Sequence, residues 1–474
     1  MEIGIVGSGI SAVSSYLALR ECNPNFEITF IDPGKRFNVE LKKNTRAAAQ
    51  KSKFGSEYMY ETTGSNIVFH SPTNYSMANG GLSSVWGAGL RIWPEKSLQQ
   101  LRFDVDAIYS SAARLLMHLP HSGSAESIGI PSSAQVKDED YPQGSEPLFR
   151  ITQSNQQENP SMLRPSLAIA TSGIKSCRGC GQCLTGCPYG SIFDAGDFID
   201  NLVMENKAKR LYGVVSKVKQ IDNHVDVQVI QNDLTVTSSF DLILLCAGAV
   251  GTPSILQKSN LLPNKIEVLD SQAFYFVALK TPFSKQHKLK FALSEVGYYK
   301  KDESINIYAS LYESNNEVRK KIAYKISQVI HLPIRNLPSI IDRFLVLGIG
   351  FLDSQSSGKI IIQSDEIGAV HIRNATNKKT KQAVKRALRQ IAKDFNSRKL
   401  RIVPRVTLIP EVGLGFHSGG AAPLDSEHVT SLGTLRKANR IRIADTTLLP
   451  FLEPGPHTFT SMALNHGLLS SAKL

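Results

Sequence analysis

The sequence has no apolar run long enough to span a membrane, and no stretch of it repeats another. It also lacks the charged region and short apolar core that mark a signal peptide, because Met1 is followed at once by a strand-like segment, Glu2 to Val6. We therefore expect a soluble, cytoplasmic protein. Its 474 residues are enough for two or three globular domains.

A nucleic-acid-binding pattern is also missing, although the chain is basic. The net charge is +13 and the isoelectric point is near 9.3. The lysines and arginines are spread along the chain, with some concentration between Lys378 and Arg405, and no basic run is interleaved with aromatic residues. We interpret the excess as solvated surface charge and expect no nucleic-acid partner.

Cysteine is scarce: there are six, and four of them fall within eleven residues. This is not the scattered pattern of a secreted domain held by disulfides. The four are Cys177, Cys180, Cys183 and Cys187. Their spacing, C-x2-C-x2-C-x3-C-P, is that of bacterial ferredoxin clusters and favours an iron–sulfur cluster. Zinc is a weaker alternative, because zinc sites usually separate two cysteine pairs by a longer loop. Metal-free thiols are the third.

The cluster type depends on Cys187. The only other thiols are Cys22, at the end of a predicted helix, and Cys246, at the end of a buried strand. Either Cys187 folds back to complete a 4Fe-4S cluster, or the first three cysteines hold a 3Fe-4S cluster. We favour the first, because glycines between the cysteines let the backbone wrap tightly.

The N-terminus has the pattern of a dinucleotide-binding βαβ unit. A strand from Glu2 to Val6 precedes a helix from Ser8 to Cys22, and a second strand runs from Glu27 to Asp32. The turn carries Gly7, Gly9 and Ala12, which allow a tight turn, close approach of a pyrophosphate and close helix packing. Asp32 is placed to accept hydrogen bonds from a ribose. The motif does not by itself distinguish FAD from NAD.

The middle of the chain differs from the N-terminal part in composition and in its predicted elements. Ser122 to Ser166 is rich in polar residues and proline and is interpreted as a long excursion. Further predicted elements are a strand pair in Leu211 to Val229, a buried strand from Asp241 to Cys246, strands from Phe274 to Lys280 and Ser304 to Tyr312, and a helix from Thr380 to Phe395. A basic amphipathic segment lies in Val318 to Leu352. It could contact a membrane surface or a partner, but packing on the protein's own core is favoured.

Glycine- and proline-rich motifs extend from the first hundred residues to the last helix. They are Gly80-Gly81-Leu82-Ser83-Ser84-Val85-Trp86-Gly87, the segment Gly248 to Ser259 with Thr252, the segment Ile441 to Pro450 with Asp445, and the short segments His417 to Gly420 and Pro456 to Thr458. Together they resemble the glucose–methanol–choline (GMC) oxidoreductases, a family of FAD enzymes that act on alcohols. One departure is Asn260, where the family's second signature usually has glycine.

The resemblance implies an α/β fold in which a split, Rossmann-like FAD-binding domain is interleaved with an α+β substrate domain built on an antiparallel sheet. We assign residues 1–110, 195–260 and 405–474 to the first, 261–404 to the second, and 111–194 to an excursion with the cysteines. The resemblance also implies that the Gly80–Gly81 loop runs along the flavin pyrophosphate and that Asp445 contacts the flavin. In the pyranose-oxidising branch a histidine before the tryptophan bonds FAD covalently. Val85 stands there in this chain, so FAD is expected to be non-covalent.

By resemblance, His417 is the catalytic base and His457 hydrogen-bonds the substrate oxygen. A neutral histidine suits alcohol oxidation, because the hydroxyl proton must leave as the hydride moves to the flavin. We therefore expect an FAD-dependent alcohol dehydrogenase that relays electrons through the cluster to an unidentified acceptor. An oxidase using oxygen with structural cysteines, a non-redox flavin lyase and a pure electron-transfer module are the alternatives.

The expected substrate is a small-molecule alcohol, with a sugar or polyol preferred. Tyrosines that could stack on sugars, or equally form a sheet surface, are Tyr298, Tyr299, Tyr308 and Tyr312.

Overall fold

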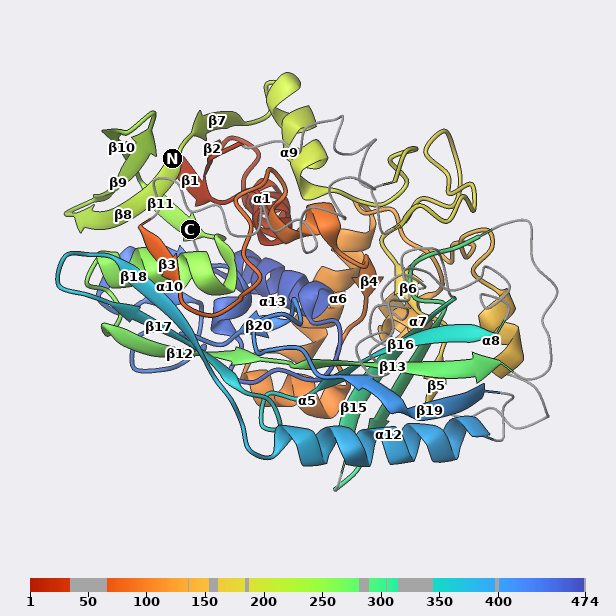
Figure 1. The fold of residues 1–474 in the computed structure, drawn as a ribbon. Coiled ribbons are helices and arrows are strands. Elements are labelled where there is room, and N and C mark those ends of the chain that lie inside the picture. The colour runs from red at the N-terminus through yellow and green to blue at the C-terminus, as the bar shows by residue number, and fades with distance from the viewer. Residues whose placement is uncertain are drawn as a thin grey trace.

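A computed structural model describes residues 1–34, 66–134, 136–152, 161–183, 187–280, 290–303, 305–313, 344–396 and 400–472. Over these ranges the chain has a mixed α/β fold with several sheets, shown in Figure 1. The α/β class is thus confirmed, whereas the division into domains stays a prediction. No helix among these ranges is both long and apolar enough to cross a membrane.

The first sheet is built from strands that lie far apart in the sequence. Its order is β21-β22-β11-β1-β2-β7. The strands are β1 (Glu2–Val6), β2 (Glu27–Asp32), β7 (Lys209–Tyr212), β11 (Leu242–Leu245), β21 (Thr434–Leu435) and β22 (Ala438–Ile443). All neighbours pair in parallel except β21 and β22. The carboxyl ends of β1, β2, β11 and β22 therefore meet at one edge, where open α/β sheets bind their ligands.

Helices cover this sheet because its central strands are apolar on both faces. The side chains of β11, Leu-Ile-Leu-Leu, are all buried. Helix α1 (Ile10–Cys22) connects β1 to β2, and α13 (Thr458–Ser471) packs between α1 and α6 (Val105–Leu116). Eleven of the fourteen residues of α13 are buried, including the polar Asn465 and His466, which explains why this helix has no separate apolar and polar faces.

A second sheet is antiparallel and has the order β19-β13-β16-β15-β14-β5. It consists of β5 (Met162–Leu163), β13 (Ala273–Lys280), β14 (Val296–Lys301), β15 (Asn306–Glu313), β16 (Leu345–Leu352) and β19 (Leu400–Leu408). Helix α12 (Thr380–Asn396) lies along one face of it, as Figure 1 shows. Its predicted apolar face forms a core with the sheet, centred on Val384, Ile391 and Phe395.

The remaining elements surround these two sheets. A five-stranded sheet contains β3 (Ile67–Phe69), β12 (Lys265–Asp270), β17 (Lys359–Ser364), β18 (Val370–Ala375) and β20 (Ser418–Gly419). A three-stranded sheet contains β8 (Val214–Ile221), β9 (His224–Gln231) and β10 (Leu234–Phe240), and β4 (Gly89–Leu90) pairs with β6 (Ser166–Leu167). The other helices are α5 (Glu95–Leu98), α7 (Ala125–Ile128), α8 (Pro147–Thr152), α9 (Ala195–Met204) and α10 (Gly248–Lys258).

Most predicted elements are confirmed within a few residues. The excursion from Ser122 to Ser166 holds only short pieces, α7, α8 and β5, in its described part. The amphipathic pattern in Val318 to Leu352 falls largely on residues 318–343, which lie outside the described residues. The end of that segment is a strand, β16, rather than a continuation of a helical pattern.

Candidate functional site

A cavity of about 950 Å³ lies between the first sheet and the antiparallel sheet. It is lined by the carboxyl ends of β1 and β2, the start of α1, strands β13, β15 and β16, and the loops before β20 and α13. The predicted site residues that line it are Gly7, Gly9, Asp32, Gly81, Ser83, Ser84, Gly248, Asp445, His417, His457, Cys183 and Cys187. Five others do not: Ala12, Gly80, Thr252, Cys177 and Cys180.

The turn between β1 and α1 requires its glycines. Gly7 has a φ of +107°, and a Cβ there would lie 2.6 Å from the carbonyl oxygen of Cys246. The backbones of Gly9 and Gly81 lie next to each other: a Cβ added to Gly81 would lie 3.5 Å from the Gly9 Cα. Ala12 is fully buried in the core, as expected for a residue that holds helix and strand together. The result is a narrow, glycine-lined cradle at the N-terminus of α1 that backbone alone can form.

The Gly80 loop is held by the hydroxyls of its own serines. It forms a short 3-10 helix, η1 (Gly81–Val85). Ser83 Oγ donates to the Gly80 carbonyl at 2.6 Å, and Ser84 Oγ donates to the Gly81 carbonyl at 2.8 Å. The Gly80 N–H donates to Ser8 Oγ at 3.1 Å, which fixes the loop against the first turn of the chain. Ser83 and Ser84 therefore shape the cradle as well as line it.

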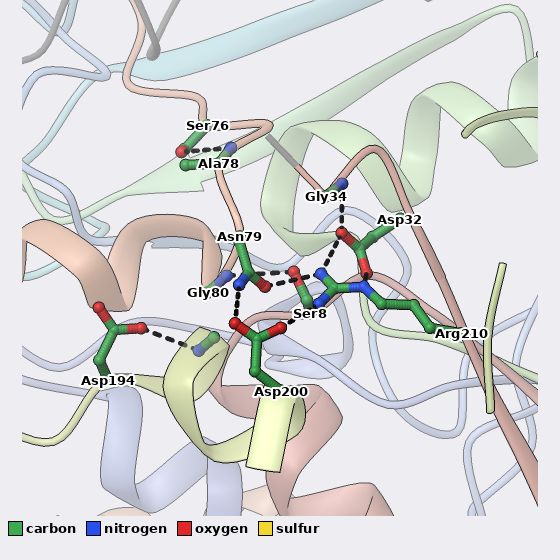
Figure 2. A network of polar contacts seen from close by, with 11 residues as sticks. Ser8, Asp32, Gly34, Ser76, Ala78, Asn79, Gly80, Asp194, Asp200 and Arg210 are labelled. Carbon is green, nitrogen blue, oxygen red and sulfur yellow. Dashed lines mark hydrogen bonds and ion pairs between the residues drawn. The ribbon is translucent and has the colours of Figure 1, made fainter. Parts of the chain in front are cut away.

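Asp32 is held by an arginine that sequence reasoning did not identify. Figure 2 shows Arg210 of β7 donating to both carboxylate oxygens of Asp32, at 3.0 and 2.7 Å. The same guanidinium donates to Asp200 at 2.6 Å and to the side-chain oxygen of Asn79 at 2.7 Å. Both Arg210 and Asp32 are almost fully buried, with side chains 2% and 3% exposed. Asp32 is therefore one member of a buried charge network, and Asn79 ties that network to Gly80.

Asp445 connects the second signature to the strand that returns from it. Its Oδ2 accepts from the Gly248 N–H at 2.8 Å and from Thr252 Oγ1 at 2.6 Å. Its Oδ1 accepts from the Thr447 N–H at 2.9 Å. Burial raises the pKa of the Asp445 carboxyl, although these hydrogen bonds oppose that rise. Thr252 thus acts on Asp445 rather than on the cavity itself.

The two predicted catalytic histidines lie next to each other in the lining of the cavity. Their ring centroids lie 5.1 Å apart at an interplanar angle of 65°. Burial, together with the neighbouring His457, lowers the pKa of His417 well below its ordinary value. Burial lowers the pKa of His457 to about 4. Within the described ranges, Nδ1 of each ring has no hydrogen-bond partner. Both rings are therefore neutral at pH 7.

The four tyrosines named from the sequence lie on different faces of the antiparallel sheet. Tyr308 and Tyr312 line the cavity. Tyr298 is fully buried and donates to Asp394 at 2.6 Å. Tyr299 lies under the guanidinium of Arg91, 4.1 Å from its ring centroid. Only the first two can contact a molecule in the cavity.

The cysteine run lies beside the cavity, which Cys183 and Cys187 line. The Ser191 N–H donates a hydrogen bond to the Sγ of Cys187 at 3.3 Å. Burial works to raise the pKa of Cys187, but hydrogen bonds from Ser191, Tyr189 and Ile192 outweigh it and lower that pKa. Burial raises the pKa of Cys183 to about 12.

The cysteines do not form a single-ion site as the structure stands. Among the described residues, which leave out 184–186, no three His, Cys, Asp or Glu side chains are grouped so that they could hold a metal ion. All four cysteines of the run are free thiols. The other two cysteines lie outside the run. Cys22 is exposed. Cys246 is buried, and its Sγ lies 3.4 Å from Ser15 Oγ.

Comparison with known proteins gives a fold but no family. No protein-family model matches the chain, and no curated protein matches it. Among solved structures, the chain is similar to the crystal structure of pyridoxine 4-oxidase from Mesorbium loti, with a TM-score of 0.67. The match covers 99% of this chain and 98% of that chain, at 14% sequence identity. The two proteins therefore share a fold over their whole length.

Proposed function

We propose that the protein is an FAD-dependent oxidoreductase of the GMC type that oxidises an alcohol to a carbonyl compound. The observation that carries the proposal is the pair His417 and His457, two neutral histidines that meet in a cavity also lined by the glycine cradle. The shared fold with an oxidase of pyridoxine agrees with it.

The residues present fit FAD. The cradle of Gly7, Gly9 and Gly81 would hold the pyrophosphate, because no side chain obstructs the backbone there and the N-terminus of α1 favours negative charge. A Cβ on Gly248, at the start of α10, would meet no atom within 4 Å, so this backbone also faces open space. When bound, the flavin ring supplies the acceptor for the hydride.

His417 would accept the hydroxyl proton of the substrate, and His457 would hydrogen-bond the same oxygen. A base must be unprotonated to act, and the lowered pKa values of both rings meet that requirement at pH 7. Phe351 packs against His417, with ring centroids 4.5 Å apart, and restricts water around the imidazole. The chain's own contribution is thus a dry, positioned base next to the site of hydride loss.

We further propose that electrons leave through an iron–sulfur cluster held by Cys177, Cys180, Cys183 and Cys187. Support comes from the ferredoxin-like spacing and from the Ser191 N–H that donates to the Sγ of Cys187 at 3.3 Å, since such hydrogen bonds tune cluster potentials. Cys183 and Cys187 also line the cavity that would hold the flavin. A dehydrogenase that passes single electrons to a separate acceptor is favoured over an oxidase on this ground.

Anaerobic reduction of the flavin tests the proposed function. Purified protein should be yellow, and an alcohol substrate should bleach the flavin absorbance without oxygen. A flavin lyase would turn over without bleaching, and protein that carries no FAD would overturn the proposal.

Admitting oxygen to the reduced protein then separates the two redox alternatives. Rapid reoxidation with formation of hydrogen peroxide would identify an oxidase. Slow reoxidation by oxygen but rapid reoxidation by a one-electron dye would identify a dehydrogenase.

A further inference from the structure

We propose that the substrate of this site is an uncharged alcohol whose body is a flat aromatic ring. This inference rests on the proposed function and names its substrate class. It differs from the sugar or polyol that the tyrosine-rich sequence suggests. The antiparallel sheet forms the wall of the cavity from which this substrate class is inferred.

This wall is made by alternate residues of three neighbouring strands. In a strand, residues two apart lie on the same face. The lining residues are Ala273 and Tyr275 of β13, Tyr308, Ser310 and Tyr312 of β15, and Leu347, Ile349 and Phe351 of β16. Four of these eight side chains are aromatic and two are branched aliphatic groups. The wall therefore offers chiefly apolar, aromatic surface.

The charged groups of the same strands lie on the opposite face. Glu313 follows Tyr312 and forms an ion pair with Lys280 at 2.8 Å. Alternation places both of them away from the cavity, and neither lines it. The five Asp and Lys residues that do line the cavity, Asp32, Asp194, Asp197, Lys258 and Asp445, belong to the elements around the parallel sheet. In the described part of these strands, nothing would pair with a charged substrate.

Four of the eight side chains of the wall carry a hydroxyl group, and the other four, Ala273, Leu347, Ile349 and Phe351, have none. A polyol would place some of its hydroxyl groups against Leu347, Ile349 and Phe351, which cannot pair with them, and burying a hydroxyl without a partner is unfavourable. An aromatic ring gains by leaving water for this surface and can stack on its neighbours. Phe351, in contact with His417, extends the aromatic surface to the place of reaction.

The test measures anaerobic flavin reduction of the holoenzyme by three alcohols in a stopped-flow spectrometer. The alcohols are 4-methoxybenzyl alcohol, its anionic counterpart 4-(hydroxymethyl)benzoate, and the polyol sorbitol. The ratio of the reduction rate constant to the dissociation constant should be about 100-fold higher for the neutral aromatic alcohol than for either of the others. Reduction that is faster with sorbitol or with the carboxylate overturns the inference but leaves the proposed function standing. Reduction by another alcohol but by none of these three would overturn the inference alone, and protein without FAD would overturn both.

Variants of the wall locate the effect. Tyr312→Ala and Leu347→Ala should each lower this ratio for 4-methoxybenzyl alcohol by about tenfold or more. Tyr312→Phe, which keeps the ring, should lose less than Tyr312→Ala. Leu279→Ala is the matched control, because Leu279 lies on the same face of β13 as Tyr275 but four residues further along, is 38% exposed and does not line the cavity; it should stay near the parent value. FAD content and melting temperature confirm folding. Equal losses in the control and the wall variants would contradict the inference.

Discussion

The carboxylate of Asp270 accepts a hydrogen bond from Ser418 Oγ, the residue after His417, at 3.0 Å. Its other oxygen accepts from the Gly413 N–H at 2.9 Å. Asp270 is fully buried at the end of β12, so one carboxylate fixes both ends of the segment that carries His417. The Ser271 N–H adds a bond to the His417 carbonyl at 2.8 Å. The end of β12 therefore positions the segment that carries His417, the proposed base.

Two substitutions of Asp270 should distinguish the effect of its hydrogen bonds from the effect of its negative charge. Asp270→Ala leaves the Gly413 N–H and the Ser418 hydroxyl without an acceptor and should slow flavin reduction by about tenfold or more, because small shifts of a catalytic group are costly. Asp270→Asn should lose much less, since the amide oxygen can accept from Gly413 and the amide N–H can donate to Ser418. Stopped-flow reduction of both variants checks this. Equal losses would show that the charge matters rather than the bonds.

The buried carboxyl of Asp270 should also make the stability of the protein depend on pH. Burial raises the pKa of Asp270 to about 6 in the folded protein, above its unfolded value near 3.8. Between these values the folded state holds the proton and the unfolded state does not, so this group's contribution to stability falls as pH rises from about 4 to 6. The melting temperature of Asp270→Asn minus that of the parent should therefore increase over this interval and level off above it. A constant difference would contradict the raised pKa.

His417→Ala should slow flavin reduction by about two to four orders of magnitude, the usual effect of removing a general base. FAD content should stay near that of the parent, and His457→Ala should slow reduction less. The pH profile of the parent adds a second check. Because both pKa values are lowered, the rate should be flat around neutrality and fall only in acid, toward the pKa of about 4 for His457. A fall centred near pH 6.5, the ordinary histidine value, would contradict the buried environment.

Local patterns predicted the first βαβ unit and the motif segments well. Gly7 and Gly9 could be identified because a tight turn and a close backbone approach leave a glycine signature in neighbouring residues. Arg210 left no such signal. It meets Asp32 only because β7 adds to the sheet beside β2, from 178 residues away. A residue that strand pairing brings to a motif has no fixed distance from that motif in the sequence, so the motif cannot predict it.

The tyrosines show a second limit of sequence reasoning. Tyr298 and Tyr299 are adjacent, and so point to opposite faces of β14, yet neither reaches the cavity. Tyr308 and Tyr312 do so because β15 is more central in the sheet and presents that face to the loops around the parallel strands. Alternation indicates which residues share a face but not which face is covered. The preference for a sugar depended on that missing information.

Arg210→Met should destabilise the protein by about 3–5 kcal/mol, because it leaves the buried carboxylates of Asp32 and Asp200 without their cation. FAD content should fall as well, since Asn79 and Asp32 lose the group that orients them beside the cradle. Urea unfolding and flavin absorbance measure the two effects. Lys209→Met is the matched control: Lys209 is the neighbouring residue on β7, and its ion pair with Glu27 is exposed, so little should change. Equal midpoints for the two variants would contradict the role of the network.

FAD should be released intact by acid. Val85 is the residue before Trp86, where a histidine would be needed for a covalent bond, and it lines the cavity with an alkyl side chain that cannot form one. After precipitation with trichloroacetic acid, all the yellow colour should appear in the supernatant. Flavin that stays with the pellet would show a covalent link through another residue.

Protein purified without oxygen should contain iron and acid-labile sulfide, with a broad absorbance beyond the flavin bands. Cys180→Ser should lose that absorbance and keep its FAD, because Cys180 does not line the cavity. Substrate should still bleach the flavin of this variant, whereas transfer to one-electron acceptors should become slow.

Cys22→Ser is the matched control for the cluster, since Cys22 is an exposed free thiol at the end of α1, outside the run. It should keep the iron, the sulfide and the electron transfer of the parent. The N–H donors around Cys187 make a second distinction, because they stabilise a thiolate whether or not iron is bound. Metal analysis therefore decides between the alternatives. Stoichiometric zinc without sulfide would replace the cluster by a structural zinc site, and anaerobic protein with neither metal would leave the cysteines as thiols and favour the oxidase.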